Sequence, residues 1–102
     1  MFTTVQIIGP SMAPAMRTGD YWVVWRTKKV RPGQVVLLRH PLRPELPIVK
    51  RLISQPGPGL WWVEGDSPHI SDDSRVFGPV ATSAIVGRVT FRYYPLRRRR
   101  RM

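Results

Sequence analysis

The sequence contains no cysteine and only two histidines among its 102 residues. Without cysteine, disulfides and thiolate metal sites are excluded, and the redox compartment stays unassigned. His40 and His69 follow no spacing that is typical of metal ligands, so we expect neither a metal site nor a cofactor. Each histidine is next to a proline, and we interpret both as residues of surface loops.

Long apolar runs are also missing. The longest aromatic and apolar run, Tyr21–Trp25, is closed by Arg26 and is far shorter than the roughly 20 residues of a membrane-spanning helix. The chain before Ser11 carries neither a charged leader nor a long apolar block, so we expect no signal peptide. The sequence therefore predicts a cytoplasmic protein, or one peripheral at a membrane, without an integral membrane segment.

Acidic residues are scarce, because 17 lysines and arginines face only 6 aspartates and glutamates. Five arginines form the run 97–101, which is the only low-complexity segment. We expect one folded domain over residues 1–95 and a basic tail over residues 96–102. The tail is either a solvated arm with little function or a contact for a membrane surface or an acidic partner. We expect no specific nucleic-acid partner.

Proline and glycine are abundant, with 11 and 8 residues, and they leave little room for long helices. Between them lie short runs rich in β-branched and aromatic residues, which predict strands at Thr3–Ile8, Tyr21–Trp25, Gln34–Arg39, Ile48–Ile53, Leu60–Glu64 and Ile85–Tyr94. We expect turns at residues 31–33, 55–59 and 65–68, and one helical turn within residues 11–18. The pattern indicates a mainly β domain, a coiled sheet or partly closed barrel.

Two residues offer the minimum for acyl transfer without histidine: the Ser11 hydroxyl and the Lys50 amine. The period of two along the strand at 48–53 places Lys50 on one face with Ile48 and Leu52. Burial there lowers the pKa of the lysine, as a general base near neutral pH requires. The alternative is a lysine whose stem packs on the sheet while its amine reaches water, and periodicity alone favours that alternative.

Four segments, taken in order, resemble the type I signal peptidase family of Ser/Lys proteases. Ser11–Asp20 is similar to the family's nucleophile box, 31–36 to its next strand, 49–53 to its lysine box and 65–78 to its closing box. The resemblance extends from Gly9 to about Pro95. It implies the coiled β catalytic core shared with LexA-like proteins, and a serine endopeptidase with residues 1–95 as its catalytic domain.

The resemblance also implies roles for individual residues. Ser11 would attack the scissile carbonyl, Lys50 would act as general base, and Ser71 would orient the lysine. An ordinary turn hydroxyl is the alternative for Ser71. Asp73 and Arg75 match a structural pair that braces the loop near the lysine.

Two further positions concern the walls of the site. Met12 follows the nucleophile and would shape the substrate pocket, fill the core, or do both. The oxyanion region would comprise Gly9 and the Ser11 N–H. Many family members have a serine or threonine where this chain has Gly9, so backbone or water must replace that hydroxyl.

Within the family, the chain is most similar to the small soluble proteases that mature nickel-containing superoxide dismutase. It lacks both the membrane spans before the nucleophile and the inserted second β domain of typical members, and 39–46 and Trp61-Trp62 resemble that group. The implied partner is a precursor protein whose leader is removed so that the new N-terminus binds nickel. The metal would belong to the product and not to this chain.

Other functions compete with this interpretation. One is general signal peptidase cleavage of secretory leaders, after small residues such as alanine. Another is a basic β barrel that binds nucleic acid through arginines and aromatic residues and performs no catalysis. A self-cleaving LexA-type domain and a family member that only binds leaders fit less well. At least half of the four tryptophans, Trp22, Trp25, Trp61 and Trp62, are expected in the core.

Overall fold

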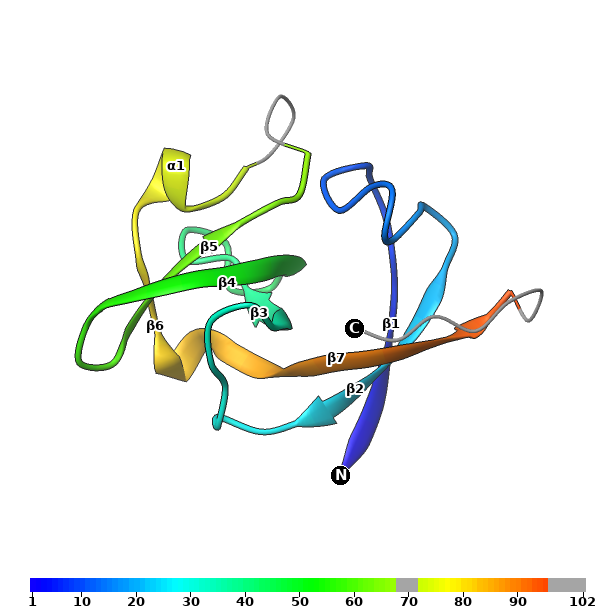
Figure 1. Cartoon of the computed structure of the whole chain (residues 1–102), viewed down its shortest axis with the longest axis horizontal. Helices are drawn as coiled ribbons and strands as arrows, with labels where there is room; N and C mark the ends of the chain where they lie inside the picture. The colour runs from blue at the N-terminus through cyan, green and yellow to red at the C-terminus, as the bar shows by residue number, and fades with distance from the viewer. Residues whose placement is uncertain (68–71, 96–102) are drawn as a thin grey trace.

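The computed structural model describes residues 1–67 and 72–95, which form one antiparallel sheet wrapped around its own core (Figure 1). The sheet has seven strands in the order β1-β2-β7-β3-β4-β5-β6, and every neighbouring pair is antiparallel. The strands are β1 Phe2–Gln6, β2 Tyr21–Arg26, β3 Val35–Arg39, β4 Pro47–Gly57, β5 Leu60–Glu64, β6 Val80–Ala81 and β7 Ile85–Tyr94. The prediction of a mainly β coiled sheet is confirmed.

Two short helices and one strand were not predicted: α1 at Ser74–Phe77, the 3₁₀ turn η2 at Thr82–Ala84, and β6. Elements of two to four residues are too short to show a hydrophobic period, so only their tertiary contacts define them. No helix in the described ranges 1–67 and 72–95 is long and apolar enough to cross a membrane.

The predicted turn at residues 55–59 is wrong for its first half. β4 continues through Pro56 to Gly57, and the turn is confined to Pro58 and Gly59. The ladder between β4 and β5 shifts register twice, between Leu52 and Ser54 and again before Gly57. These irregularities accommodate the proline, which cannot donate to a regular ladder.

The long strand β7 connects two clusters of buried side chains. One cluster combines side chains of β2, of one face of β3 and of β7 with those of the loop after β1, and its members are Ile7, Met12, Met16, Trp22, Val24, Val35, Leu37 and Val89. The other lies around β3, β4 and β5. Trp22 and Trp61 are buried in these clusters, so half of the four tryptophans lie in the core, as expected. Trp25 is exposed.

The interpretation of His40 as a surface loop residue is wrong. Its side chain is only 3% exposed, and the ring of Phe77 covers it edge-on at 5.1 Å. The local sequence has loop character, but Asp72, 32 residues further along the chain, supplies a hydrogen-bond partner at 2.9 Å. That partner makes burial of the imidazole acceptable. His69 and the basic tail at 96–102 lie outside the described residues.

Candidate active site

A cleft of about 390 Å³ contains both residues that the sequence singled out for acyl transfer, Ser11 and Lys50. One wall comes from the end of β1 and the loop that follows, and the other from the beginning of β4. Apart from these two residues, the lining consists of Val5, Gln6, Ile7, Ile8, Gly9, Met12, Leu46, Pro47, Ile48, Val49 and Asp72. Among residues 1–67 and 72–95, the lining is therefore mostly apolar, with one amine, one hydroxyl and one carboxylate as its reactive groups.

The loop after β1 is held in place by two buried methionines and by backbone hydrogen bonds between its two ends. Met12 and Met16 are fully buried, and the Met16 N–H donates to the Met12 carbonyl at 3.0 Å, which forms the expected helical turn. At the base, the Ile7 N–H donates to the Asp20 carbonyl at 2.8 Å and the Gly19 N–H donates to the Ile7 carbonyl at 2.8 Å. Ser11 therefore sits on a short loop held rigidly at both ends.

Ser67 holds this loop from the other side. Its N–H donates to the Ser11 carbonyl at 2.8 Å and its hydroxyl donates to the Ala13 carbonyl at 3.0 Å. Figure 1 shows the loop after β1 and the end of β5 at the same end of the molecule. Sequence reasoning placed Ser67 in the closing box but assigned it no contact, because its partners lie more than fifty residues away in the chain.

The two residues of the expected oxyanion region differ in their hydrogen bonds. Gly9 adopts a φ of +95°, where side chains are strained, and its N–H donates to the Thr18 hydroxyl at 3.0 Å. The Ser11 N–H has no acceptor within residues 1–67 and 72–95. Of these two residues, Ser11 is therefore the one whose N–H remains available to a substrate oxygen.

Lys50 is buried, with an exposed fraction of only 4%. It lies on the same face of β4 as Leu52, which is fully buried, and opposite Val36 of β3. Burial lowers the pKa of Lys50 from its ordinary value of 10.5. The charges of Asp73 and Asp72 oppose this change. A lysine in these surroundings reaches the neutral form more easily than one in water, as a proton acceptor must.

Asp73 organises the closing box. It is fully buried, caps α1, and accepts hydrogen bonds from the Gly65 N–H at 2.8 Å and the Arg75 N–H at 3.0 Å. The Arg75 guanidinium also pairs with it at 2.6 Å. Ser74 ties the same helix to β5, because its hydroxyl accepts from the Val63 N–H at 2.8 Å. The segment that carries Asp72 into the cleft is thus fixed by buried contacts.

The remaining predicted site residues divide into two groups. Met12 lines the cleft and belongs to the buried core, so both of its expected placements occur together. Ser71 lies outside the described residues, and its role stays a prediction. Asp72 and His40 were missed, because nothing in their spacing in the sequence links them to the cleft.

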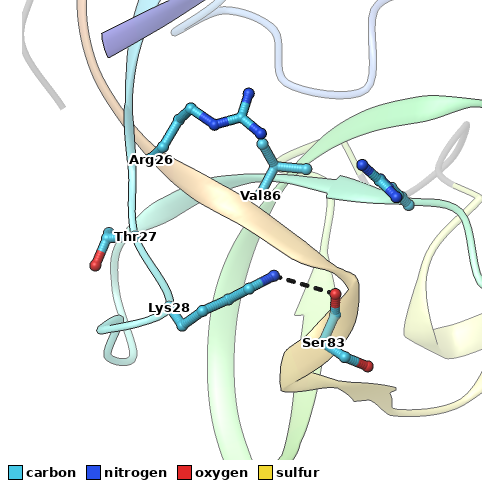
Figure 2. Close-up of a pocket in the computed structure, with 6 residues that line it drawn as sticks. Arg26, Thr27, Lys28, Ser83 and Val86 are labelled. Carbon is cyan, nitrogen blue, oxygen red and sulfur yellow. Dashed lines mark hydrogen bonds between the residues drawn. The ribbon is translucent and has the colours of Figure 1, made fainter. Parts of the chain in front are cut away.

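A second hollow also contains a lysine and a serine, Lys28 and Ser83 (Figure 2). There the Lys28 amine donates to the carbonyl oxygens of Ser83, at 3.1 Å, and of Ile85. Both of these contacts are to backbone carbonyls, and neither involves the Ser83 hydroxyl. This pair is therefore a structural brace and not a second nucleophile with its base.

No group of three or more residues with metal-ligand side chains occurs in the part of the chain that the structure describes.

Comparison with known proteins agrees with the geometry. The sequence profile of the family described as signal peptidase, peptidase S26, matches residues 1–61 and 58–94. The chain is 31% identical to mitochondrial ATP-independent inner membrane protease subunit 1a of Arabidopsis thaliana, over 93% of this chain and 72% of that protein. It is 35% identical to mitochondrial inner membrane protease subunit 2 of Schizosaccharomyces pombe, over 90% of this chain and 64% of that protein. The chain thus spans about two thirds of these relatives.

Proposed function

Because this chain belongs to the S26 signal peptidase family of serine endopeptidases, we propose that it removes an N-terminal leader from a precursor protein with Ser11 as nucleophile and Lys50 as general base. The observation that carries the proposal is the placement of a buried lysine in the same apolar cleft as a serine on a rigid loop. Ser71 would orient the lysine, as the family resemblance implies.

The reaction proceeds in two steps. Neutral Lys50 takes the proton from the Ser11 hydroxyl while the oxygen attacks the scissile carbonyl, and the Ser11 N–H donates to the oxyanion that forms. The charged lysine returns the proton to the leaving amine as the peptide bond breaks, which leaves an acyl-enzyme. A water molecule, deprotonated by Lys50, then hydrolyses the ester and restores both residues.

The shape of the cleft favours an extended substrate. In the described ranges, β1 pairs on one side only, with β2, and residues 47–50 of β4 pair only with β3. Both open edges border the cleft, which is lined by Val5 and Gln6 on one side and by Ile48 and Val49 on the other. The backbone N–H and carbonyl groups of an extended leader can pair with such edges. The family resemblance implies small side chains, such as alanine, before the scissile bond.

For the substrate we propose the precursor of a nickel-containing superoxide dismutase. The resemblance of residues 39–46 and of Trp61-Trp62 to the maturation proteases supports it, as does the direct β4–β5 hairpin, which leaves no room between these strands for a second domain. The alternative is a broader leader peptidase, since the relatives are named as proteases of the mitochondrial inner membrane. A contact between the basic tail and a membrane surface or acidic partner remains a prediction.

Two precursors decide between these substrates: one of nickel superoxide dismutase and one with an Ala-x-Ala secretory leader. We expect the intact chain to process the first at its leader boundary, as seen by mass spectrometry of the new N-terminus. Ser11→Ala should abolish processing, while Ser83→Ala, at the serine beside Lys28, should retain it. Cleavage of the secretory leader alone would shift the substrate but keep the mechanism. If the intact chain leaves both precursors uncut, the proposal fails.

A further inference from the structure

The imidazole of His40 is held in one tautomer by its surroundings. The Leu42 N–H donates to Nδ1 at 3.1 Å, so Nδ1 carries the lone pair. In the neutral ring the proton is then on Nε2, which lies 2.9 Å from an Asp72 carboxylate oxygen. His40 therefore donates to Asp72, and the short loop after β3 determines the direction of that hydrogen bond.

Asp72 differs from its partner in exposure. Its side chain is 54% exposed, while that of His40 is 3% exposed. An exposed carboxylate normally samples several rotamers, but this one is tied to a buried ring packed against Phe77. The buried histidine thus gives a fixed position to a negative charge at the edge of the cleft.

That charge acts on the amine proposed as the general base. Asp72 lines the cleft together with Lys50, and its carboxylate raises the pKa of Lys50 against the effect of burial. The other charges that act on Lys50 are Asp73, in the same sense, and Arg75, in the opposite sense. β3 contributes the apolar Val36 opposite the lysine, and the cleft lining from β1 and its loop is uncharged.

We propose that His40 is a positioning residue of this site: by donating to Asp72 it fixes a negative charge in the cleft that holds Lys50. The proposal rests on the proposed Ser/Lys mechanism and adds a control of its working pH. A lysine faced by this carboxylate keeps its proton to higher pH than one faced by a neutral side chain. The arrangement sets the pH at which the amine becomes available for the first proton transfer.

The titration of Lys50 tests the proposal without any need for activity. The chain has only three lysines, 28, 29 and 50, so the side-chain NMR signals are few, and Lys50→Met identifies the one of interest. We expect Asp72→Asn and His40→Phe to move the Lys50 midpoint to lower pH. His40→Gln, which keeps an N–H near the position of Nε2, should remain close to the intact chain. Glu45→Gln, which also removes one carboxylate from an exposed loop, should cause no shift.

The double variant separates positioning from mere structural support. If His40 acts through Asp72, His40→Phe causes no further shift in the Asp72→Asn background. An equal shift in both backgrounds, or no shift from Asp72→Asn, would overturn the proposal. The acid limb of cleavage should follow the NMR midpoints in every variant. An intact chain that titrates as expected but cuts no precursor would contradict the proposed function and leave the electrostatic assignment standing.

Discussion

Replacement of Lys50 by methionine is expected to lower kcat/KM for leader cleavage by about 10³-fold or more, because the serine loses its only proposed proton acceptor. The same change should leave the fold at least as stable at neutral pH. Burial lowers the pKa of Lys50, so the folded state disfavours its charged form, and methionine fills similar space without a charge. Activity assays and denaturant titrations on the same samples measure both effects.

The stability difference between the intact chain and Lys50→Met should depend on pH. Between the lowered pKa of the folded state and the ordinary value of 10.5, the unfolded chain binds more protons at Lys50 than the folded chain. The free energy of unfolding of the intact chain therefore increases as the pH rises through this window. The advantage of Lys50→Met should be fully present below the window and lost above it. A variant that is less stable than the intact chain at neutral pH would contradict the unfavourable burial of the charged amine.

Lys28→Met is the matched control. Lys28 donates to two backbone carbonyls in a hollow that shares no lining residue with the cleft. Figure 2 shows its contact with Ser83. Its loss should cost about 1 kcal/mol of stability and leave cleavage intact. The two lysines are thus expected to show opposite patterns, and equal losses of activity would argue against a special role for Lys50.

Replacement of Asp73 by asparagine should produce the largest loss of stability of any single change in the closing box, about 3 kcal/mol. The fully buried carboxylate accepts from the Gly65 N–H and from both backbone and side chain of Arg75. An amide turns an N–H₂ group toward donors and removes the nearest carboxylate partner of Arg75, which keeps only the more distant Glu64 at 3.8 Å. We expect a lower denaturant midpoint and, since the neighbouring Asp72 moves with the loop, weaker cleavage.

Asp66→Asn is the comparison for this effect. Asp66 also pairs with an arginine in a two-pronged contact, at 3.0 Å to both Nε and Nη2 of Arg51, but at a solvent-accessible position. Its loss should cost less than about 1 kcal/mol. Equal destabilisation by Asp66→Asn and Asp73→Asn would mean that the burial of Asp73 adds nothing to the strength of its contacts.

The strands could be predicted because they are coded locally. Leu60–Glu64 and Ile85–Tyr94 have the bounds expected from the sequence, since turn residues and β-branched runs mark both ends. The face of β4 that carries Lys50 was predicted by the same means. The period of two could not show how deeply the Lys50 side chain is buried. Its burial depends on β3 and on the carboxylates after β5, which are distant in the sequence.

The contacts that tune the site could not be predicted, since they join distant parts of the chain. The sequence around His40 has the character of a surface loop, and its burial depends on the distant Asp72, 32 positions later, and on the ring of Phe77. Ser67 likewise gains its role only when the end of β5 meets the loop of Ser11. Local propensity says nothing about such pairs, whose partners are determined by the order of strands in the sheet.

The most direct test of the central claim is trapping of the acyl-enzyme. An activated ester of a short peptide that ends in Ala-x-Ala is mixed with the intact chain, and the modified residue is located by peptide mass spectrometry. We predict an acyl group on Ser11, formed quickly by the intact chain, slowly by Lys50→Met and not by Ser11→Ala. Acylation of Ser83 or Ser67 in place of Ser11, or an equal rate without Lys50, would contradict the assignment of nucleophile and base.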